Sequence, residues 1–221
     1  MDEREYVRRA RDGYDSVAVE YLDLFGDSLR ERPLERAMID VFAESVRAAG
    51  SLPVADIGCG PGFVTEYMRT LGLDVRGVDL SAEMIALARR TYPGIRFDLG
   101  DMTAVDLPDG SLGGVVSRSS IIHTPPERVG AVFAEFHRLL VPGGHLLLAF
   151  QATDATSQVA WPFDHVVAPA FRWSIGRVAA LLREAGFGEV ARLITAPEED
   201  PVRGFHYCHM LTRKAQQPTT A

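Results

Sequence analysis

Cysteine, lysine and long apolar runs are the scarce features of this 221-residue sequence. The two cysteines, Cys59 and Cys208, are too few for a disulfide framework or a zinc cluster. No apolar run approaches the roughly 20 residues that a membrane-spanning helix needs. The charged residues 1–5 also lack the apolar core of a signal peptide. These absences predict a cytoplasmic protein with no membrane partner and no metal site.

Basic charge is limited as well. Lys214 is the single lysine, and the formal net charge is −7. Proteins that bind nucleic acids concentrate lysine and arginine in a stripe that follows the phosphate backbone. The sequence has no such stripe, so we expect no nucleic-acid partner.

A glycine-rich loop follows a strand-like apolar run near residue 54. Asp56 ends that run, Gly58, Gly60 and Gly62 alternate after it, and a helix-like segment follows. Glycines allow a tight turn and a close approach of a ligand to the main chain. The helix directs its free N–H groups at that ligand. Because a carboxylate at Asp56 would repel a pyrophosphate and attract an ammonium group, the loop favours a zwitterionic ligand.

A second acid lies at the end of the next strand-like run. Asp79 follows Gly58 by 21 positions, close to the roughly 20-residue offset of a ribose-binding carboxylate in nucleotide-binding folds. Dehydrogenases share this feature, so Asp79 alone does not separate NAD from other nucleosides. The glycine spacing separates the two classes, because this sequence has GxGxG whereas dinucleotide-binding loops have GxGxxG.

The acid-x-Gly-x-Gly-x-Gly pattern resembles motif I of the class I S-adenosylmethionine (SAM) dependent methyltransferases. Residues 139–146 are similar to the "L-x-P-G-G-x-L" segment of the same family. The resemblance covers nearly the whole chain and implies one Rossmann-like α/β domain, residues 1–221. Its doubly wound sheet would have seven mostly parallel strands with an antiparallel last strand, under a helical N-terminal lid. Alternating strands and helices independently favour a parallel sheet covered on both faces.

The expected organisation has four regions, namely a helical lid (1–50), a SAM-binding core (51–150), a substrate-side loop (151–173) and a C-terminal part (174–214). After the glycine loop, strands are expected at 74–80, 95–99, 112–117, 145–150, 189–196 and 205–213. Helices are expected at 63–71, after the capping residue Ser81, at 126–140 and from Ser174 to 185.

The resemblance implies a SAM site at the carboxyl ends of the strands, with S-adenosylhomocysteine as product and no metal. In the family, an acid at Asp101 bonds the adenine amine, and its neighbour packs on the ring. Tyr14 and Tyr21 share one helical face and would close over the methionine end, or would only pack the helix onto the domain. The full expected set is Tyr14, Tyr21, Asp56, Gly58, Cys59, Gly60, Gly62, Asp79, Leu80, Met84, Gly100, Asp101, Met102 and Ser117.

Acceptor contacts are expected after the fourth strand and in the 23-residue connection 151–173, whose aromatic content argues against disorder. The alternative is a loop with its own small core at the sheet edge. His123 is the leading candidate for a general base and His165 the second, with His206 third. His123 could instead only bond a backbone carbonyl. The expected acceptor-binding residues are Arg118, Ser119, His123, Trp161, Phe163, His165 and Phe171.

These features predict a methyltransferase that moves the methyl group of SAM in line to an oxygen or nitrogen atom of a small molecule. The Ile-His-Thr-Pro-Pro segment, residues 122–126, resembles a segment of bacterial methyltransferases of unassigned or natural-product tailoring function. Proximity supplies about 7–11 kcal/mol of barrier reduction and a base about 10²–10⁴-fold in rate. A non-catalytic SAM-binding protein and a nicotinamide-dependent oxidoreductase remain alternatives, and the sequence leaves monomer and homodimer open.

Overall fold

The computed structural model describes residues 3–25, 29–200 and 202–216. Its strands are β1 (Val54–Ile57), β2 (Val75–Asp79), β3 (Arg96–Leu99), β4 (Leu112–Arg118), β5 (Leu140–Thr153), β6 (Ala160–Phe163), β7 (Ala170–Ser174), β8 (Phe187–Thr195) and β9 (His206–Lys214). Its helices are α1 (Glu3–Phe25), α2 (Pro33–Ala48), α3 (Phe63–Thr70), α4 (Ala82–Thr91), α5 (Val129–Leu139) and α6 (Ile175–Glu184), with short 3-10 turns η1 (Ile121–His123) and η2 (Pro197–Glu199).

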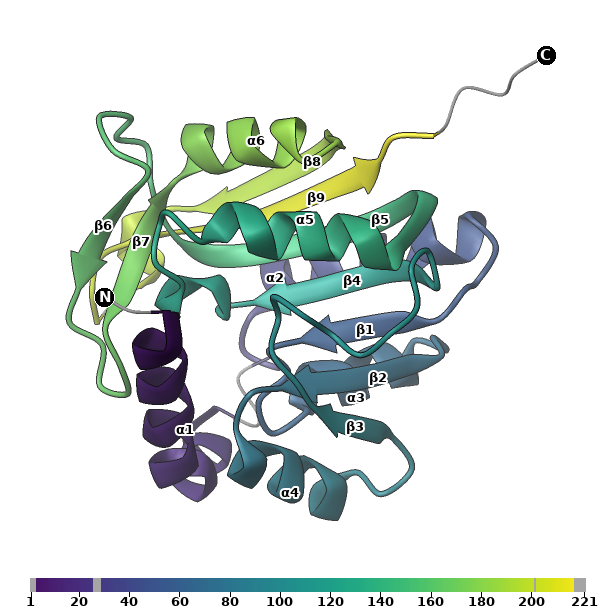
Figure 1. The fold of residues 1–221 in the computed structure, drawn as a ribbon, viewed down its shortest axis with the longest axis horizontal. Helices are drawn as coiled ribbons and strands as arrows, with labels where there is room; N and C mark the ends of the chain where they lie inside the picture. Colours follow the sequence, from purple (N-terminus) through teal and green to yellow (C-terminus); the bar gives the residue numbers. More distant parts are fainter. Residues whose placement is uncertain (1–2, 26–28, 201, 217–221) are drawn as a thin grey trace.

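A single twisted sheet forms the centre of the described residues (Figure 1). Strands β3, β2, β1, β4 and β5 lie in this order and pair in parallel. Strand β9 pairs antiparallel with β5, and β8 pairs antiparallel with β9. These seven strands confirm the expected mostly parallel sheet with an antiparallel last strand, and β6 and β7 bring the sheet to nine strands, two more than expected.

The connection expected between residues 151 and 173 is not a loop throughout, and this part of the prediction was wrong. Strand β5 continues to Thr153, beyond its last partner on β9 at Ala152. Strand β7 pairs in parallel with Ala152 and Thr153 at the end of β5, and β6 pairs antiparallel with β7. The hairpin formed by β6 and β7 therefore provides hydrogen-bond partners for backbone groups at the end of β5, which a loop would leave unpaired.

Strand β5 also begins earlier than expected. It starts at Leu140, directly after α5, and runs through the Pro-Gly-Gly segment predicted as a turn. The pairing with β4 shifts register across this segment, from Leu112–Leu140 to Gly114–His145. The three residues thus form an irregularity within a strand. A β-bulge of this kind inserts extra residues without ending the ladder.

Helices cover both faces of the sheet. α2 and α3 pack on one face with Val116 and Leu147, and α5 and α6 pack on the other with Val115 and Leu146. Successive side chains of a strand point to opposite faces, so neighbouring residues of β4 and β5 join different cores. This explains why the central strands are almost continuously apolar.

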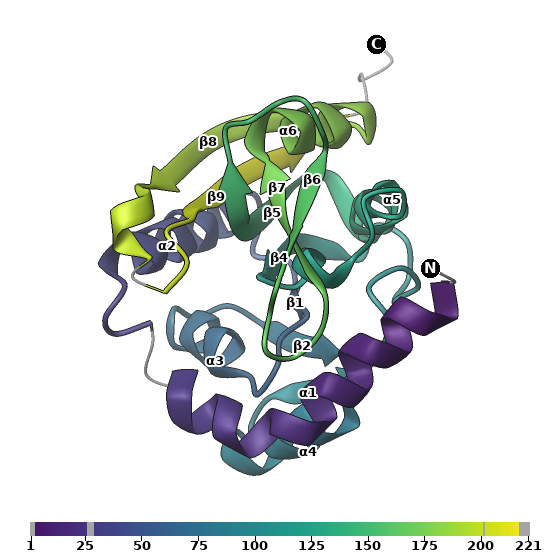
Figure 2. The same cartoon turned by 90° about the vertical axis from the view of Figure 1, so that its left-hand side faces the viewer.

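Helix α1 lies across the carboxyl ends of the parallel strands (Figures 1 and 2). The Asp15 carboxylate accepts hydrogen bonds from the Ser81 hydroxyl (2.5 Å) and the Glu83 N–H (3.2 Å) at the start of α4. Gly13 of α1 approaches the connection between β6 and β7 so closely that a Cβ added to Gly13 would lie 2.5 Å from the Val167 carbonyl oxygen. Two separate contacts therefore hold the lid helix over the strand ends.

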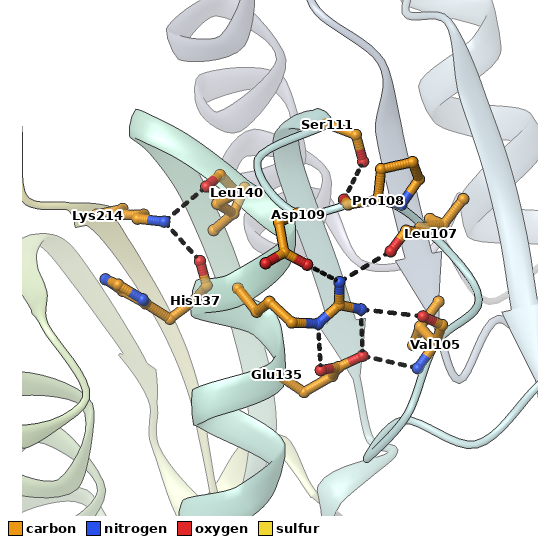
Figure 3. Close-up of polar contacts among 10 residues, drawn as sticks. Val105, Leu107, Pro108, Asp109, Ser111, Glu135, His137, Leu140 and Lys214 are labelled. Atoms are coloured by element: carbon orange, nitrogen blue, oxygen red, sulfur yellow. Dashed lines mark hydrogen bonds and ion pairs between the residues drawn. The ribbon is translucent and has the colours of Figure 1, made fainter.

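The connection between β3 and β4 is anchored by Arg138 in the last turn of α5. Its guanidinium donates to the carbonyls of Val105 and Leu107 and to the carboxylates of Asp109 and Glu135. In Figure 3, Val105, Leu107, Asp109 and Glu135 surround one guanidinium group. The network stabilises a segment without helix or strand that begins with Asp101.

No helix among the described residues is both long and apolar enough to span a bilayer.

Candidate functional site

A cavity of about 110 Å³ opens where α1 covers the carboxyl ends of β1, β2, β3 and β4. This is the edge at which open α/β sheets bind ligands. The predicted residues that line it are Tyr14, Tyr21, Asp56, Gly58, Cys59, Gly60, Asp79, Leu80, Met84, Gly100, Asp101, Met102, Arg118, Ser119 and His123. The chain thus brings together in space most of the residues that the motifs separated in sequence.

The glycines of the loop after β1 have left-handed backbones, with φ of 81° at Gly58, 53° at Gly60 and 90° at Gly62. Side chains other than hydrogen are disfavoured in this region. A Cβ on Gly58 would meet the Ser120 side chain at 2.3 Å, whereas Gly60 has no atom within 4 Å of that position. Gly60 therefore leaves its side of the loop open toward the cavity.

Gly62 does not line the cavity, and its role is in packing. A Cβ there would lie 2.7 Å from the Phe97 ring. Gly62→Ala is expected to lower the free energy of unfolding by about 2–4 kcal/mol through backbone strain and overpacking. Urea denaturation measures this change. Gly94→Ala is the control, since nothing lies within 4 Å of its Cβ position; equal midpoints for both variants would contradict the packing role.

Asp56 is a buried acid in the wall of the cavity, with 1% of its surface exposed. The Thr65 hydroxyl donates to its Oδ2 atom at 2.6 Å. Burial raises the pKa of Asp56 to about 7, against the lowering effect of the Thr65 hydrogen bond. A cation that entered the cavity would stabilise the ionised carboxylate.

Asp79 joins the glycine loop to the start of α4. One of its oxygens accepts the Gly60 N–H at 2.7 Å, and the other accepts the Ser81 N–H at 2.9 Å. Burial raises the pKa of Asp79, and the two N–H groups oppose this shift. The carboxylate is thereby oriented at the cavity between β1 and β2.

Asp101 and Met102 begin the anchored connection after β3. The Asp101 Oδ1 atom accepts hydrogen bonds from the Thr103 N–H and hydroxyl at 2.8 and 2.7 Å. Leu80 and Met84 add apolar surface to the cavity from the other side of β2. The far end of the cavity therefore combines an oriented acid with apolar walls.

His123 and Tyr14 form a hydrogen-bonded pair between η1 and the lid helix. The Tyr14 hydroxyl lies 2.9 Å from Nε2 of His123, and Nδ1 lies 2.9 Å from the Pro169 carbonyl oxygen. A carbonyl can only accept, so Nδ1 carries the proton, and Nε2 of the neutral ring accepts from Tyr14. Burial lowers the pKa of His123, which favours this neutral form. The carbonyl contact considered as an alternative is present, and it leaves Nε2 as a proton acceptor.

The aromatic residues of the β6–β7 hairpin do not line the cavity. His165 packs edge-on against His123 with ring centroids 5.1 Å apart, and Phe163 contacts both His165 and Phe205. Trp161 is half-buried, and Phe171 packs near Trp173. Ala160, Ala170 and Trp173 of the hairpin belong to the large core beneath α5 and α6, and Phe163 and Phe171 pack against that core, so the hairpin does not form a small core of its own.

Ser117 also lies outside the cavity. It is fully buried, and its hydroxyl is 2.5 Å from that of Ser120, which does line the cavity. The sequence reading missed Ser120 and Thr124, and it missed the lid residues Tyr6, Val7, Ala10 and Arg11. Tyr6, Ala10 and Tyr14 recur every four residues, a helical spacing that could have indicated the lid face. No cluster of metal ligands occurs in the described part of the chain.

Residues 54–144 match the methyltransferase domain family. The chain is 31% identical over 130 residues to the malonyl-[acyl-carrier protein] O-methyltransferase of Enterobacter lignolyticus, covering 58% of this chain and 51% of that protein. It is 33% identical over 147 residues to phosphoethanolamine N-methyltransferase 3 of Arabidopsis thaliana, covering 62% and 29%. The chain thus spans about half or less of the length of these relatives.

A solved structure shares the fold over almost the whole chain. It is the Burkholderia thailandensis 1,6-didemethyltoxoflavin-N1-methyltransferase with 1,6-didemethyltoxoflavin and S-adenosylhomocysteine bound. The TM-score is 0.77 at 24% identity, with 98% of this chain and 92% of that chain covered. Residues 54–144 therefore resemble the methyltransferase domain family, and the chain shares the fold of this solved methyltransferase.

Proposed function

We propose that the protein transfers a methyl group from SAM to an oxygen or nitrogen atom of a small molecule. The observation that carries this proposal is the meeting, in one cavity, of the glycine loop, the buried Asp56, the half-buried Asp79 and a neutral histidine. The loop and the acids suit a nucleoside with an amino-acid end. The histidine provides a proton acceptor beside them.

The cavity residues fit the proposed cofactor. Asp56 is a buried carboxylate without a cationic partner in the described structure, as an ammonium-binding group requires. Gly60 leaves open space, and Asp79 and Asp101 offer acceptors for ribose and adenine groups. When bound, SAM supplies a methyl group that its sulfonium already activates.

The residues of this chain contribute orientation, water exclusion and proton transfer. Helix α1, fastened through Asp15, covers the reacting groups. Ser119 and Ser120 offer hydroxyls to an acceptor at the end of β4. The Tyr14 hydroxyl can take the proton that leaves an acceptor hydroxyl or ammonium group while it passes its own proton to Nε2 of His123, because Pro169 keeps the ring hydrogen on Nδ1.

A small-molecule acceptor agrees with the names of the relatives, which include both O- and N-methyltransferases. The net charge of −7 disfavours a nucleic acid. A role in natural-product tailoring, a cytoplasmic location and a monomeric or homodimeric state are further parts of the proposal.

Calorimetric titration with SAM, S-adenosylhomocysteine and NAD tests the proposal first. Micromolar affinity for the two sulfur ligands and none for NAD is the expected result. Binding of NAD alone would support the nicotinamide-dependent alternative. Turnover of SAM with a panel of small hydroxyl and amine acceptors would then separate an enzyme from a non-catalytic SAM-binding protein.

Asp79→Ala is expected to weaken binding of SAM and S-adenosylhomocysteine at least tenfold, about 1.4 kcal/mol, because the ribose hydroxyls lose a half-buried carboxylate acceptor. Calorimetry measures both affinities. Asp74→Ala is the matched control, because Asp74 is exposed and distant from the cavity lining. Unchanged affinity in Asp79→Ala would remove the ribose assignment.

A further inference from the structure

Arg118 places a buried positive charge at the end of the cavity away from Asp79 and Asp101. It is the last residue of β4, whereas Asp79 ends β2 and Asp101 follows β3, at the opposite side of β1. Its side chain is 12% exposed and lines the cavity. A charged side chain is rarely buried to this extent without a specific partner.

The partner of Arg118 is Glu35 on α2, and it occupies only part of the guanidinium. Nε and Nη2 of Arg118 donate to the two carboxylate oxygens of Glu35. Nη1 makes no hydrogen bond among the described residues. The guanidinium carbon lies 5.7 Å from the ring centroid of Phe63, which also lines the cavity. The group is therefore oriented from one side and retains free N–H donors.

Glu35 does not cancel the positive charge at this wall of the cavity, because its carboxylate is shared between two arginines. Arg32 approaches Glu35 at 3.6 Å with a side chain that is 48% exposed. His209, buried beside them, has its pKa lowered to about 4 by burial and by the two arginines, against the charge of Glu35. Burial raises the pKa of Tyr21 and Tyr207. The cluster of Arg118, Arg32 and Glu35 thus carries one excess positive charge.

The cavity consequently presents a carboxylate at Asp56 and a guanidinium at Arg118. Arginine binds carboxylates with its planar pair of N–H donors, and such bonds are strongest where water is excluded. Ser119, next in the chain, has a left-handed backbone with φ of 51° and a hydroxyl 2.6 Å from that of Tyr207. This contact ties the segment after Arg118 to β9.

We propose that Arg118 is the anion-binding residue of this cavity and holds a carboxylate of a bound molecule. The inference rests on the proposed function and adds a residue and a ligand chemistry to it. The carboxylate can belong to the amino-acid end of the cofactor or to the acceptor. A purely structural ion pair between β4 and α2 is the competing explanation.

The first arm of the test compares S-adenosylhomocysteine with 5′-methylthioadenosine, which has the same nucleoside but no amino-acid end. Arg118→Gln is expected to weaken S-adenosylhomocysteine at least tenfold and to leave methylthioadenosine unchanged if the carboxylate is that of the cofactor. Arg192→Gln is the matched control, because that arginine also donates two hydrogen bonds to a glutamate, Glu189, and does not line the cavity. It should change neither affinity.

The second arm titrates malonate, a simple dicarboxylate probe, into protein saturated with S-adenosylhomocysteine. If Arg118→Gln weakens the affinity for malonate at least tenfold, the carboxylate that Arg118 holds is that of the acceptor. If Arg118→Gln keeps wild-type affinity for both S-adenosylhomocysteine and malonate, the proposal is overturned and the ion pair is structural.

Methylthioadenosine affinity also reports whether a variant is folded. If Arg118→Gln no longer binds methylthioadenosine, Arg118→Lys replaces it in the test. Lysine keeps a positive charge beside Glu35 but lacks the paired N–H donors, so this variant should weaken binding of the carboxylate ligand and keep its affinity for methylthioadenosine. A wild-type protein that binds neither nucleoside would contradict the proposed function. Malonate titration of the free protein would then still test Arg118 by itself.

Discussion

His123→Gln is expected to lower turnover by about 10²–10⁴-fold, the usual contribution of a general base, while leaving affinity for S-adenosylhomocysteine unchanged. Glutamine can donate to the Pro169 carbonyl and accept from the Tyr14 hydroxyl, so it can preserve both hydrogen bonds of His123. It cannot accept a proton. The loss should therefore appear in kcat for an acceptor that must release a proton.

The pH dependence provides a second measurement on His123. Because burial lowers its pKa below the ordinary value of 6.5, the ring stays neutral at pH 7. The rate of the wild-type protein should accordingly fall only below pH 6.5. His206→Gln is the control, since His206 also contacts a carbonyl, that of Thr195, but does not line the cavity. Full activity of His123→Gln would leave positioning as the catalytic device.

Asp56→Asn is expected to have opposite effects on ligand binding and on stability. Removing one partner of a buried charge pair costs about 2–5 kcal/mol, so affinity for S-adenosylhomocysteine should fall about 30-fold or more at pH 8. In the free protein, however, the variant should be more stable than the wild type. The ionised carboxylate is buried there without a cation, and asparagine avoids that penalty.

The sign of the stability effect follows from the raised pKa. Asp56 titrates at about 7 in the folded protein and at 3.8 in the reference state, so the folded form binds its proton more tightly. The contribution of this group to stability is present below pH 4 and is lost as pH rises through 7. Asp56→Asn should therefore gain up to about 2–4 kcal/mol at pH 8 and little at pH 4.

Urea denaturation at the two pH values and calorimetry at pH 8 measure these effects. Asp74→Asn, at an exposed position, should alter neither stability nor affinity. A gain in stability that is the same at both pH values would show that the charge of Asp56 is not its origin.

Local sequence patterns predicted the sheet and the cofactor end of the cavity. Left-handed glycines, an acid at a strand end and the capping residues Ser81 and Ser174 act within a few residues of chain. Both serines accept the expected N–H bonds at the starts of α4 and α6. The parallel sheet then gathers the strand ends at one edge whatever the lengths of the intervening segments.

The residues that bind the acceptor are less open to prediction from local patterns. The aromatic residues of 151–173 were expected as the wall of an acceptor pocket, which stays a prediction, and Phe163 and His165 contact neighbouring rings outside the lining of the cavity. The pair formed by Tyr14 and His123 joins residues 109 positions apart, and the ion pair of Glu35 with Arg118 joins residues 83 apart. No periodicity or motif reports contacts at such separations.

The sequence by itself determined the α/β class, the mostly parallel sheet and the glycine loop with Asp56 and Asp79. These depend on local backbone preferences and on the alternation of strand-like and helix-like segments along the chain. Only the tertiary structure decided which nitrogen of His123 carries the proton, where α1 is fastened and which N–H donors of Arg118 are free. Those properties depend on packing between distant segments, because burial and hydrogen-bond partners set the charge and orientation of a side chain.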